Sequence, residues 1–285
     1  MNKLSFSGHD TFICKQPWLK KGYDFIINDY SFSDENAVVH LGVGKNMVSA
    51  IRYWLKSFGL IDEKDEPTKF ANHVFGKSGI DPYLEDIGTI WLLHYHLIKT
   101  RKASIYNLIF NEFKRERFDV QKEVLFRFLK RKCDEENLKI SYNKTLTADI
   151  NVFIKNYSND ESRNNGLYEE MSGILIELNL LKYDKQRETV SFNINHKEDI
   201  PKEIILFAIL DNENYGSSIT VRELMNGIDS VGRIFLINYD SLLEKIDSIA
   251  KVYSNVIFSD TAGNQVVQFK NKIDKWKVLD AYYKK

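Results

Sequence analysis

Two short clusters in the sequence contain the residue types that hydrolytic chemistry needs. The first, Gly8-His9-Asp10-Thr11-Phe12, places an imidazole, a carboxylate and a hydroxyl next to one another. Such a group could bind a metal ion or begin a general acid/base pair. The alternative is a structural element in which His9 or Thr11 bonds to the backbone while Phe12 packs on apolar surface. His9 and Asp10 are therefore candidate catalytic residues, with a structural role as the alternative.

The second cluster spans residues 81–86 and contains three carboxylates, those of Asp81, Glu85 and Asp86. Nucleases that depend on Mg²⁺ or Mn²⁺ hold the metal ion with such oxygens. However, Asp81 followed by Pro82 is also a favourable start for a helix, and acidic residues suit the positive end of a helix. The cluster predicts either a site for Mg²⁺ or Mn²⁺ or helix capping, and capping is the simpler explanation.

The sequence lacks the patterns of several other enzyme classes. Gly42-Val43-Gly44-Lys45 is too short for a Walker loop, because only Val43 separates the glycines and Asn46 follows the lysine. We find no dinucleotide glycine fingerprint and no Gly-x-Ser-x-Gly nucleophile elbow. The 2 cysteines supply neither a zinc cluster nor a disulfide framework. We therefore expect no nucleotide or organic cofactor.

Residues 45–58 are expected to form a helix with a cationic face. Apolar residues recur along one side, whereas polar and basic residues recur at helical spacing along the other, without a carboxylate among them. The width of this polar face suits the DNA major groove, where Arg52 could bond guanine and Asn46 could bond adenine. The predicted DNA-binding residues are Lys45, Asn46, Ser49, Arg52, Tyr53 and Lys56.

The residues around this helix complete a helix-turn-helix plan. Ser33 is a favourable N-cap for a short helix that ends at Gly42, and Gly59 is a natural left-handed cap for the helix after it. Residues 60–68 predict a strand and a turn, which would make a wing, although its acidic tip is unsuited to touching DNA. We therefore expect an N-terminal (winged) helix-turn-helix.

A second basic region covers residues 99–132, where Lys and Arg outnumber the acids and the apolar residues recur at helical spacing. Basic helix faces of this kind are common without nucleic acid. Three interpretations stay open: a solvated surface, a surface that faces phosphates, or a surface that binds the acidic face of a partner protein.

The length of 285 residues fits about two domains. Residues 156–166 are polar and lack apolar periodicity, so we expect a boundary there. Residues 1–155 would form a DNA-binding helix-turn-helix domain with a helical extension, and residues 167–285 a smaller C-terminal α+β domain. Strands are expected at 233–237, 256–259 and 265–269. The predicted fold class is mainly α with small β-hairpins (α+β).

Composition and charge limit the classes of partner. Lys+Arg and Asp+Glu both number 40, so any attraction to a polyanion must come from how the charges are distributed. The longest apolar run, residues 204–210, is far shorter than the roughly twenty residues of a membrane-spanning helix. No signal peptide is recognisable at the N-terminus. We expect a cytoplasmic protein that does not bind a membrane.

Several of these strings, taken together, resemble a known family: residues 8–12, 18–23, 41–48, 51–54 and 81–86. They resemble the bacterial domain-of-unknown-function family, encoded near sulfate-reductase-like genes, that includes SspB of single-stranded DNA phosphorothioation systems. The resemblance runs along nearly the full chain. It implies a DNA-binding component of a phage-defence modification system, one that nicks DNA so that sulfur can replace a non-bridging phosphate oxygen.

Two functions stay open at this point. The protein could be a metal-dependent endonuclease that nicks DNA, or a non-catalytic adaptor or transcription regulator that binds DNA and recruits partner enzymes. In both cases the expected partners are double-stranded DNA and the other proteins of the modification system. Sulfur insertion itself would need those other proteins.

Overall fold

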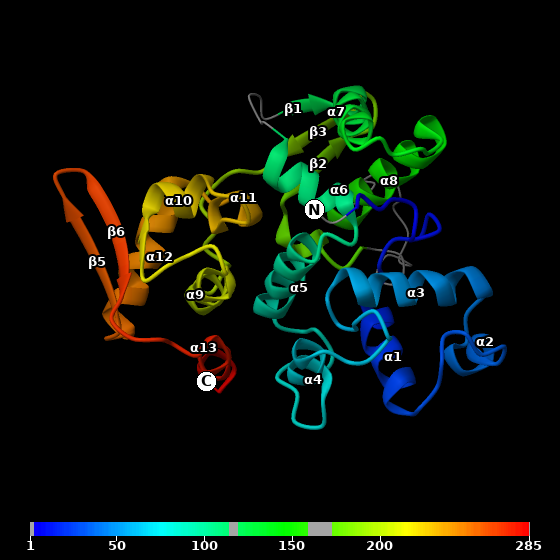
Figure 1. The fold of residues 1–285 in the computed structure, drawn as a ribbon, viewed down its shortest axis with the longest axis horizontal. Helices are drawn as coiled ribbons and strands as arrows, with labels where there is room; N and C mark the ends of the chain where they lie inside the picture. The colour runs from blue at the N-terminus through cyan, green and yellow to red at the C-terminus, as the bar shows by residue number, and fades with distance from the viewer. Residues whose placement is uncertain (1–2, 114–118, 159–172, 285) are drawn as a thin grey trace. The chain divides into compact units, whose positions relative to one another are not determined.

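The computed structural model describes residues 3–113, 119–158 and 173–284 (Figure 1). The chain forms two compact units, residues 1–193 and 194–285, which we call the first and second units. Most of the expected boundary at 156–166 lies outside the described residues. The units divide after Asn193 because the strands that precede it pair with a strand at 119–121, which keeps them in the first unit.

The described part of the first unit is mainly helical and includes a small antiparallel sheet with strand order β1-β3-β2 (Figure 1). Its helices are α1 (Gln16–Ile27), α2 (Ala37–Leu41), α3 (Lys45–Ser57), α4 (Lys69–Phe75), α5 (Ile87–Lys99), α6 (Ser104–Asn107), α7 (Lys122–Glu135) and α8 (Tyr142–Tyr157). Two short turns of helix are the π-helical Leu108–Glu112 and the 3-10 helix Ile176–Leu178. Its strands are β1 (Asp119–Gln121), β2 (Leu181–Asp184) and β3 (Thr189–Phe192).

The two glycines that were expected to end helices do so. Gly42 follows α2 with a left-handed φ of 60°, and Gly59 follows α3 with a φ of 66°. A residue with a Cβ is strained in this region, so glycine suits both positions. The first helix begins at Ala37 rather than directly after Ser33, because Asp34 first forms a turn in which its carboxylate accepts the Asn36 N–H.

Helix α3 buries its apolar side in the core of the first unit. Ile51, Trp54 and Leu55 are fully buried there. Helix α1 approaches α3 closely because Gly22 lacks a side chain: a Cβ at Gly22 would lie 2.5 Å from Leu55 Cδ1. The indole Nε1 of Trp54 donates to the Phe12 carbonyl over 3.1 Å, which ties the N-terminal loop to α3. The helix that carries the predicted DNA contacts is thus firmly anchored.

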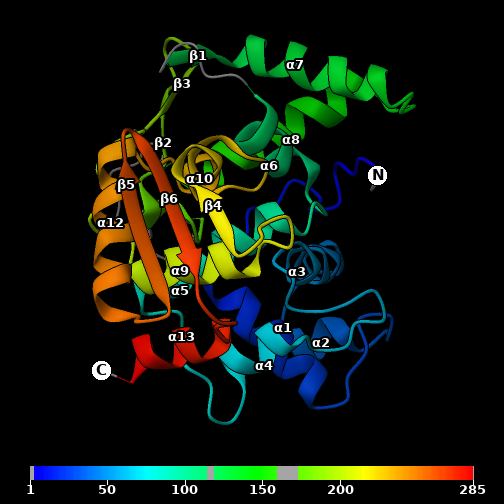
Figure 2. The same cartoon turned by 60° about the vertical axis from the view of Figure 1, so that its left-hand side comes forward.

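In the second unit, described from 194 to 284, five helices accompany a three-stranded antiparallel sheet of strand order β4-β6-β5 (Figure 2). The helices are α9 (Lys202–Asp211), α10 (Val221–Asn226), α11 (Val231–Phe235), α12 (Tyr239–Val252) and α13 (Lys275–Tyr283), and the strands are β4 (Ser218–Thr220), β5 (Val256–Thr261) and β6 (Asn264–Phe269). Strands β5 and β6 confirm the expected hairpin.

One expected strand in this unit is wrong. Residues 233–237 are not a strand, because Ser230 caps the short helix α11 by accepting the Arg233 N–H. The fold class is nevertheless α+β, as expected, since both units combine helices with a small antiparallel sheet. None of the described helices is both long and apolar enough to cross a lipid bilayer.

Candidate functional site

The cationic face of α3 meets a loop of opposite charge, residues 62–66, which we call the acidic loop. Arg52 forks onto Asp65: its Nε donates to Oδ1 over 3.0 Å, and its Nη2 lies 2.7 Å from Oδ2. Lys56 Nζ lies 3.0 Å from the same Oδ1. The expectation of a face without carboxylates is therefore wrong, because the chain folds back after α3 and places Asp65 against it.

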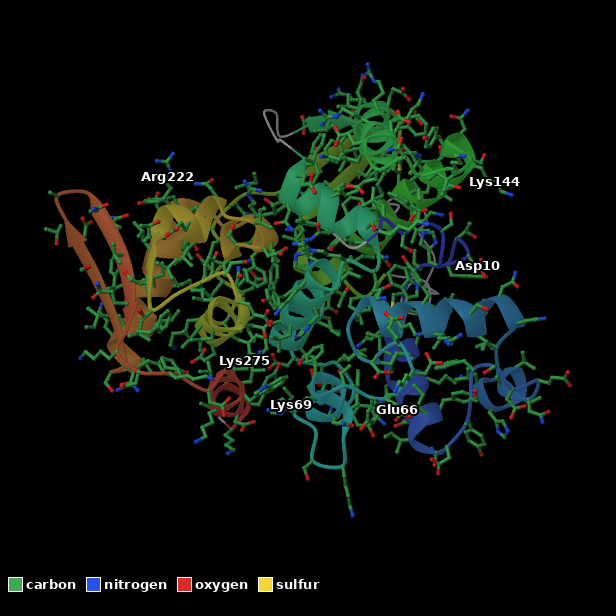
Figure 3. All side chains as sticks on the ribbon, viewed as in Figure 1. Asp10, Glu66, Lys69, Lys144, Arg222 and Lys275 are labelled. Carbon is green, nitrogen blue, oxygen red and sulfur yellow. The ribbon has the colours of Figure 1, made fainter. Side chains whose placement is uncertain are left out.

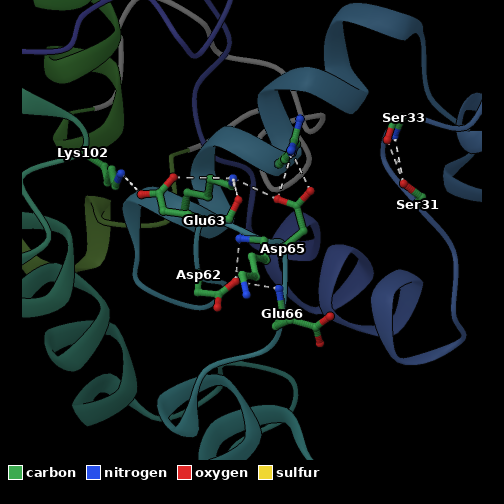
Figure 4. A network of polar contacts seen from close by, with 10 residues as sticks. Ser31, Ser33, Asp62, Glu63, Asp65, Glu66 and Lys102 are labelled. Carbon is green, nitrogen blue, oxygen red and sulfur yellow. Dashed lines mark hydrogen bonds and ion pairs between the residues drawn. The ribbon is translucent and has the colours of Figure 1, made fainter.

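Glu63 extends the same network (Figure 4). Lys56 Nζ donates to the Glu63 carbonyl over 3.1 Å and lies 3.9 Å from its carboxylate. Lys102, which follows α5, forms an ion pair with the other oxygen of that carboxylate. Two acidic side chains thus neutralise cations that come from two separate parts of the first unit.

Two opposing effects act on the pKa of the Asp65 carboxyl. Burial raises the pKa of its carboxyl, but hydrogen bonds from Arg52 and Lys56 outweigh burial and leave the pKa below its ordinary value. Asp65 is therefore ionised at neutral pH. Its backbone has a left-handed φ of 67°, which the turn at the tip of the loop requires. Asp tolerates this region better than most residues with a Cβ.

The other predicted DNA-binding residues are either exposed or, in the case of Tyr53, half-buried. Lys45, Asn46 and Ser49, in the first turns of α3, are exposed. The hydroxyl of Tyr53 is buried, and its ring packs on Gly8, where a Cβ would lie 2.3 Å from the ring. Burial and then the negative charge of Asp149 raise the pKa of Tyr53. Tyr53 therefore does not present its hydroxyl to solvent.

His9 is buried in the first unit, with 1% of its surface exposed. The Thr11 N–H donates to His9 Nδ1 over 3.1 Å, so the ring proton resides on Nε2. That Nε2 lies 3.3 Å from Oδ1 of Asp149, which is also 1% exposed. Asp149 Oδ2 in turn accepts the Ser7 N–H over 2.9 Å. Both ring nitrogens of His9 face protein groups. These contacts are those expected for the structural alternative to a catalytic role.

Asp10, unlike His9, lies at the surface of the N-terminal loop (Figure 3). The loop carries three non-glycine residues with left-handed φ, namely Ser7 at 65°, Asp10 at 47° and Thr11 at 68°. Such backbone costs energy and persists only where surrounding contacts enforce it. The contacts of His9 and Ser7 with Asp149 do so here, and they present the Asp10 carboxylate to solvent.

Residues 81–86 form a capping turn. Asp81 accepts the Glu85 N–H at Oδ1 and the Asp86 N–H at Oδ2, both over 3.0 Å. Asp86 is the N-cap of α5 and accepts the Gly88 N–H over 2.7 Å. Capping is thus observed, but α5 begins at Ile87, because Asp81 stabilises the turn that precedes the helix. Glu85 is the exposed carboxylate of this cluster.

The candidate catalytic residues do not converge on one metal site in the described residues. Across residues 3–113, 119–158 and 173–284, no three His, Cys, Asp or Glu side chains gather closely enough to hold a metal ion. The structure instead brings His9 to Asp149 and joins Asp81 to the backbone of Glu85 and Asp86. Asp149 is the participant that sequence reasoning missed.

The second basic region is also partly neutralised. Lys114, Arg115 and Arg117 lie outside the described residues. Lys132 pairs with Glu112 over 2.8 Å and with Glu135 over 2.9 Å, and these hydrogen bonds raise its pKa. The described part of this region therefore offers fewer free cations than its composition indicated.

Comparisons with other proteins identify similar sequences and folds. A profile of the family described as "Protein of unknown function (DUF4007)" matches residues 6–283. No curated protein is significantly similar in sequence. The "SspB crystal structure" has a TM-score of 0.87 and 26% identity, and the match covers 99% of this chain and 88% of that chain. The "Magnesium ion-bound SspB crystal structure" has a TM-score of 0.86, with the same identity and coverage.

Proposed function

This chain belongs to the family described as a protein of unknown function (DUF4007), and from that premise we propose that it is a DNA-binding component of a bacterial DNA phosphorothioation system. The observation that carries the proposal is the match to SspB along 99% of the chain at 26% identity. The resemblance to SspB implies that the protein acts on DNA before sulfur replaces a non-bridging phosphate oxygen.

The first turns of α3 support the DNA-binding part of the proposal. Lys45, Asn46 and Ser49 are exposed there, and Lys45 has no ion pair with any described residue. Lys45 would contact a phosphate, whereas Asn46 would reach a base edge. Because α3 is anchored through its buried apolar side, these polar groups are presented on a rigid element.

We propose further that the protein nicks one DNA strand, as the resemblance implies. Of the predicted catalytic residues, Asp10 and Glu85 present exposed carboxylates, whereas His9, Asp81 and Asp86 maintain local structure. One SspB structure contains a magnesium ion. The described residues here do not fit a magnesium site, since Asp81 and Asp86 direct oxygens at backbone N–H groups. The proposed nicking therefore includes no step that uses a metal ion.

A cellular experiment tests the role in phosphorothioation. The gene is deleted from a host whose DNA carries phosphorothioate linkages, and the linkages are then quantified by mass spectrometry of digested DNA. We expect them to disappear and to return when the wild-type gene is supplied. Unchanged phosphorothioate content in the deletion strain would contradict the proposal.

A plasmid assay separates nicking from the adaptor alternative. Supercoiled plasmid is incubated with the purified chain in Mg²⁺, Mn²⁺ or EDTA, and nicked circles are measured on a gel. We expect Asp10→Asn or Glu85→Gln to abolish nicking and Glu136→Gln, which removes an exposed carboxylate elsewhere, to leave it unchanged. DNA binding without nicking under every condition would favour the adaptor.

A further inference from the structure

The pairing between Arg52 and Asp65 has the geometry with which arginine binds a phosphate group. A guanidinium that forks onto two oxygens is the arrangement for which Arg is selected at carboxylate and phosphate sites alike. Here Nε and Nη2 of Arg52 approach the two Asp65 oxygens at 3.0 and 2.7 Å, and Lys56 adds a second cation at 3.0 Å. One acidic group thus occupies a position in which a phosphate would make the same contacts.

We propose that Arg52, Lys56 and Lys102 form a phosphate-binding site for a nucleic-acid backbone, which the acidic loop occupies with its own Asp65 and Glu63 carboxylates. The inference deepens the proposed function and rests on it. It means that the acidic loop competes with DNA phosphates for the cations of α3. It also adds Lys102, which the sequence did not connect with α3.

Two properties of the acidic loop make it displaceable. The pairs are only partly buried: the exposed fractions are 43% for Arg52, 18% for Lys56 and 22% for Asp65. All three charged groups still touch water, so salt and an added polyanion can compete for the two cations. In addition, Asp65 holds a left-handed φ of 67°, a conformation with an energetic cost for a residue with a Cβ. Phosphates can therefore replace the loop without disrupting the core.

The same chain offers a matched control. Glu66 adjoins Asp65 in the acidic loop and carries the same charge, but its side chain is exposed and points away from the network (Figure 4). Asp65→Asn removes the competing charge while keeping a residue that tolerates a left-handed φ. Glu66→Gln removes an equal charge from the same loop without changing the contacts of Arg52, Lys56 or Lys102.

The test measures binding to two probes, a fluorescein-labelled 20-base-pair duplex and inorganic polyphosphate, over a series of salt concentrations. Relative to Glu66→Gln, we expect Asp65→Asn to bind both probes about fivefold more tightly. The salt dependence should steepen by about 0.9 log-log units for each additional duplex phosphate that the variant neutralises. The double variant Arg52→Ala with Asp65→Asn should not show the tighter binding.

The outcomes separate this inference from the proposed function. Tighter binding of polyphosphate without tighter binding of the duplex would support the anion site but contradict DNA binding through it. Equal affinities of Asp65→Asn and Glu66→Gln for both probes would overturn the inference. If the wild type still bound the duplex through Lys45 in that case, the proposed function would stand. Thermal unfolding of each variant verifies that all of them are folded.

Discussion

His9 Nε2 lies 3.3 Å from Asp149 Oδ1, and each of these two residues has only 1% of its surface exposed. The Thr11 N–H donates to the other ring nitrogen over 3.1 Å, so both nitrogens of the imidazole lie against protein groups. A buried carboxylate needs such neighbours to offset its desolvation, and among the described residues His9 and Ser7 supply them. The pair therefore connects the N-terminal loop to α8 and maintains the loop's left-handed residues.

Removing Asp149 should destabilise the first unit strongly. Asp149→Ala removes the buried carboxylate beside His9 Nε2 and leaves the Ser7 N–H without its acceptor, so we expect a loss of about 3 kcal/mol in the free energy of unfolding. Urea denaturation followed by tryptophan fluorescence measures this loss. Asp10→Ala, which removes an exposed carboxylate from the same loop, should change stability by less than about 0.5 kcal/mol. Equal losses of stability for the two substitutions would show that the contacts of Asp149 do not stabilise the first unit.

Gly8 should tolerate no side chain. A Cβ there would lie 2.3 Å from two ring carbons of Tyr53, so either the loop or the ring must move. We expect Gly8→Ala to lower the free energy of unfolding by about 2 kcal/mol. Gly44 provides the comparison, because a Cβ at that position meets no atom within 4 Å. A Gly8→Ala protein as stable as Gly44→Ala would mean that the loop does not pack on Tyr53 as described.

Lys197 should make the stability of the second unit depend on pH. It is 3% exposed, and burial lowers the pKa of its ammonium group from 10.5 to about 8. Between about pH 8 and pH 10, the unfolded chain holds a proton that the folded chain has lost, so stability rises with pH in that window. From pH 7 to pH 9.5 the wild type should gain about 2 kcal/mol relative to Lys197→Met.

The exposed Lys270 supplies the control for this pH dependence. Lys270→Met should follow the wild type at both pH values, since it removes an exposed side chain and leaves Lys197 in place. Chemical denaturation at pH 7 and 9.5 provides the data. A constant difference between wild type and Lys197→Met would indicate that the Lys197 ammonium is solvated in the folded protein.

Local patterns in the sequence predicted the parts of the fold that depend on neighbouring residues. The spacing of apolar residues predicted the position of α3. Glycines predicted the ends of α2 and α3, because left-handed caps depend on a single residue type. The β5–β6 hairpin was also predicted correctly. Its turn at 262–263 lies between two strands that are adjacent in the chain.

Contacts between distant segments could not be predicted in this way. Strand β1 was included in a helical region, because its partner β3 lies some seventy residues later and no local signal connects them. Asp149 was missed for the same reason, although one signal was available. It lies between Leu146, Ile150 and Phe153 on the buried side of α8, where an acidic residue indicates a specific partner.

The position of the acidic loop could not be predicted from the sequence either. Its charge was recognised as unsuited to DNA, but its position depends on the left-handed turn at Asp65. That turn directs the carboxylate back to Arg52, which lies on the preceding helix. A helix face drawn from one element alone cannot include side chains that return from the next element.

The measurement that tests the central claim most directly is the salt dependence of duplex binding by the wild type, Lys45→Ala and Lys144→Ala. Both lysines are exposed, but only Lys45 lies on α3. Lys144 lies on α8 (Figure 3). If the first turns of α3 contact DNA, Lys45→Ala should weaken binding and reduce the log-log salt slope by about 0.9, the value for one phosphate contact. Lys144→Ala should match the wild type. Identical affinities and slopes for all three proteins would contradict DNA binding through α3.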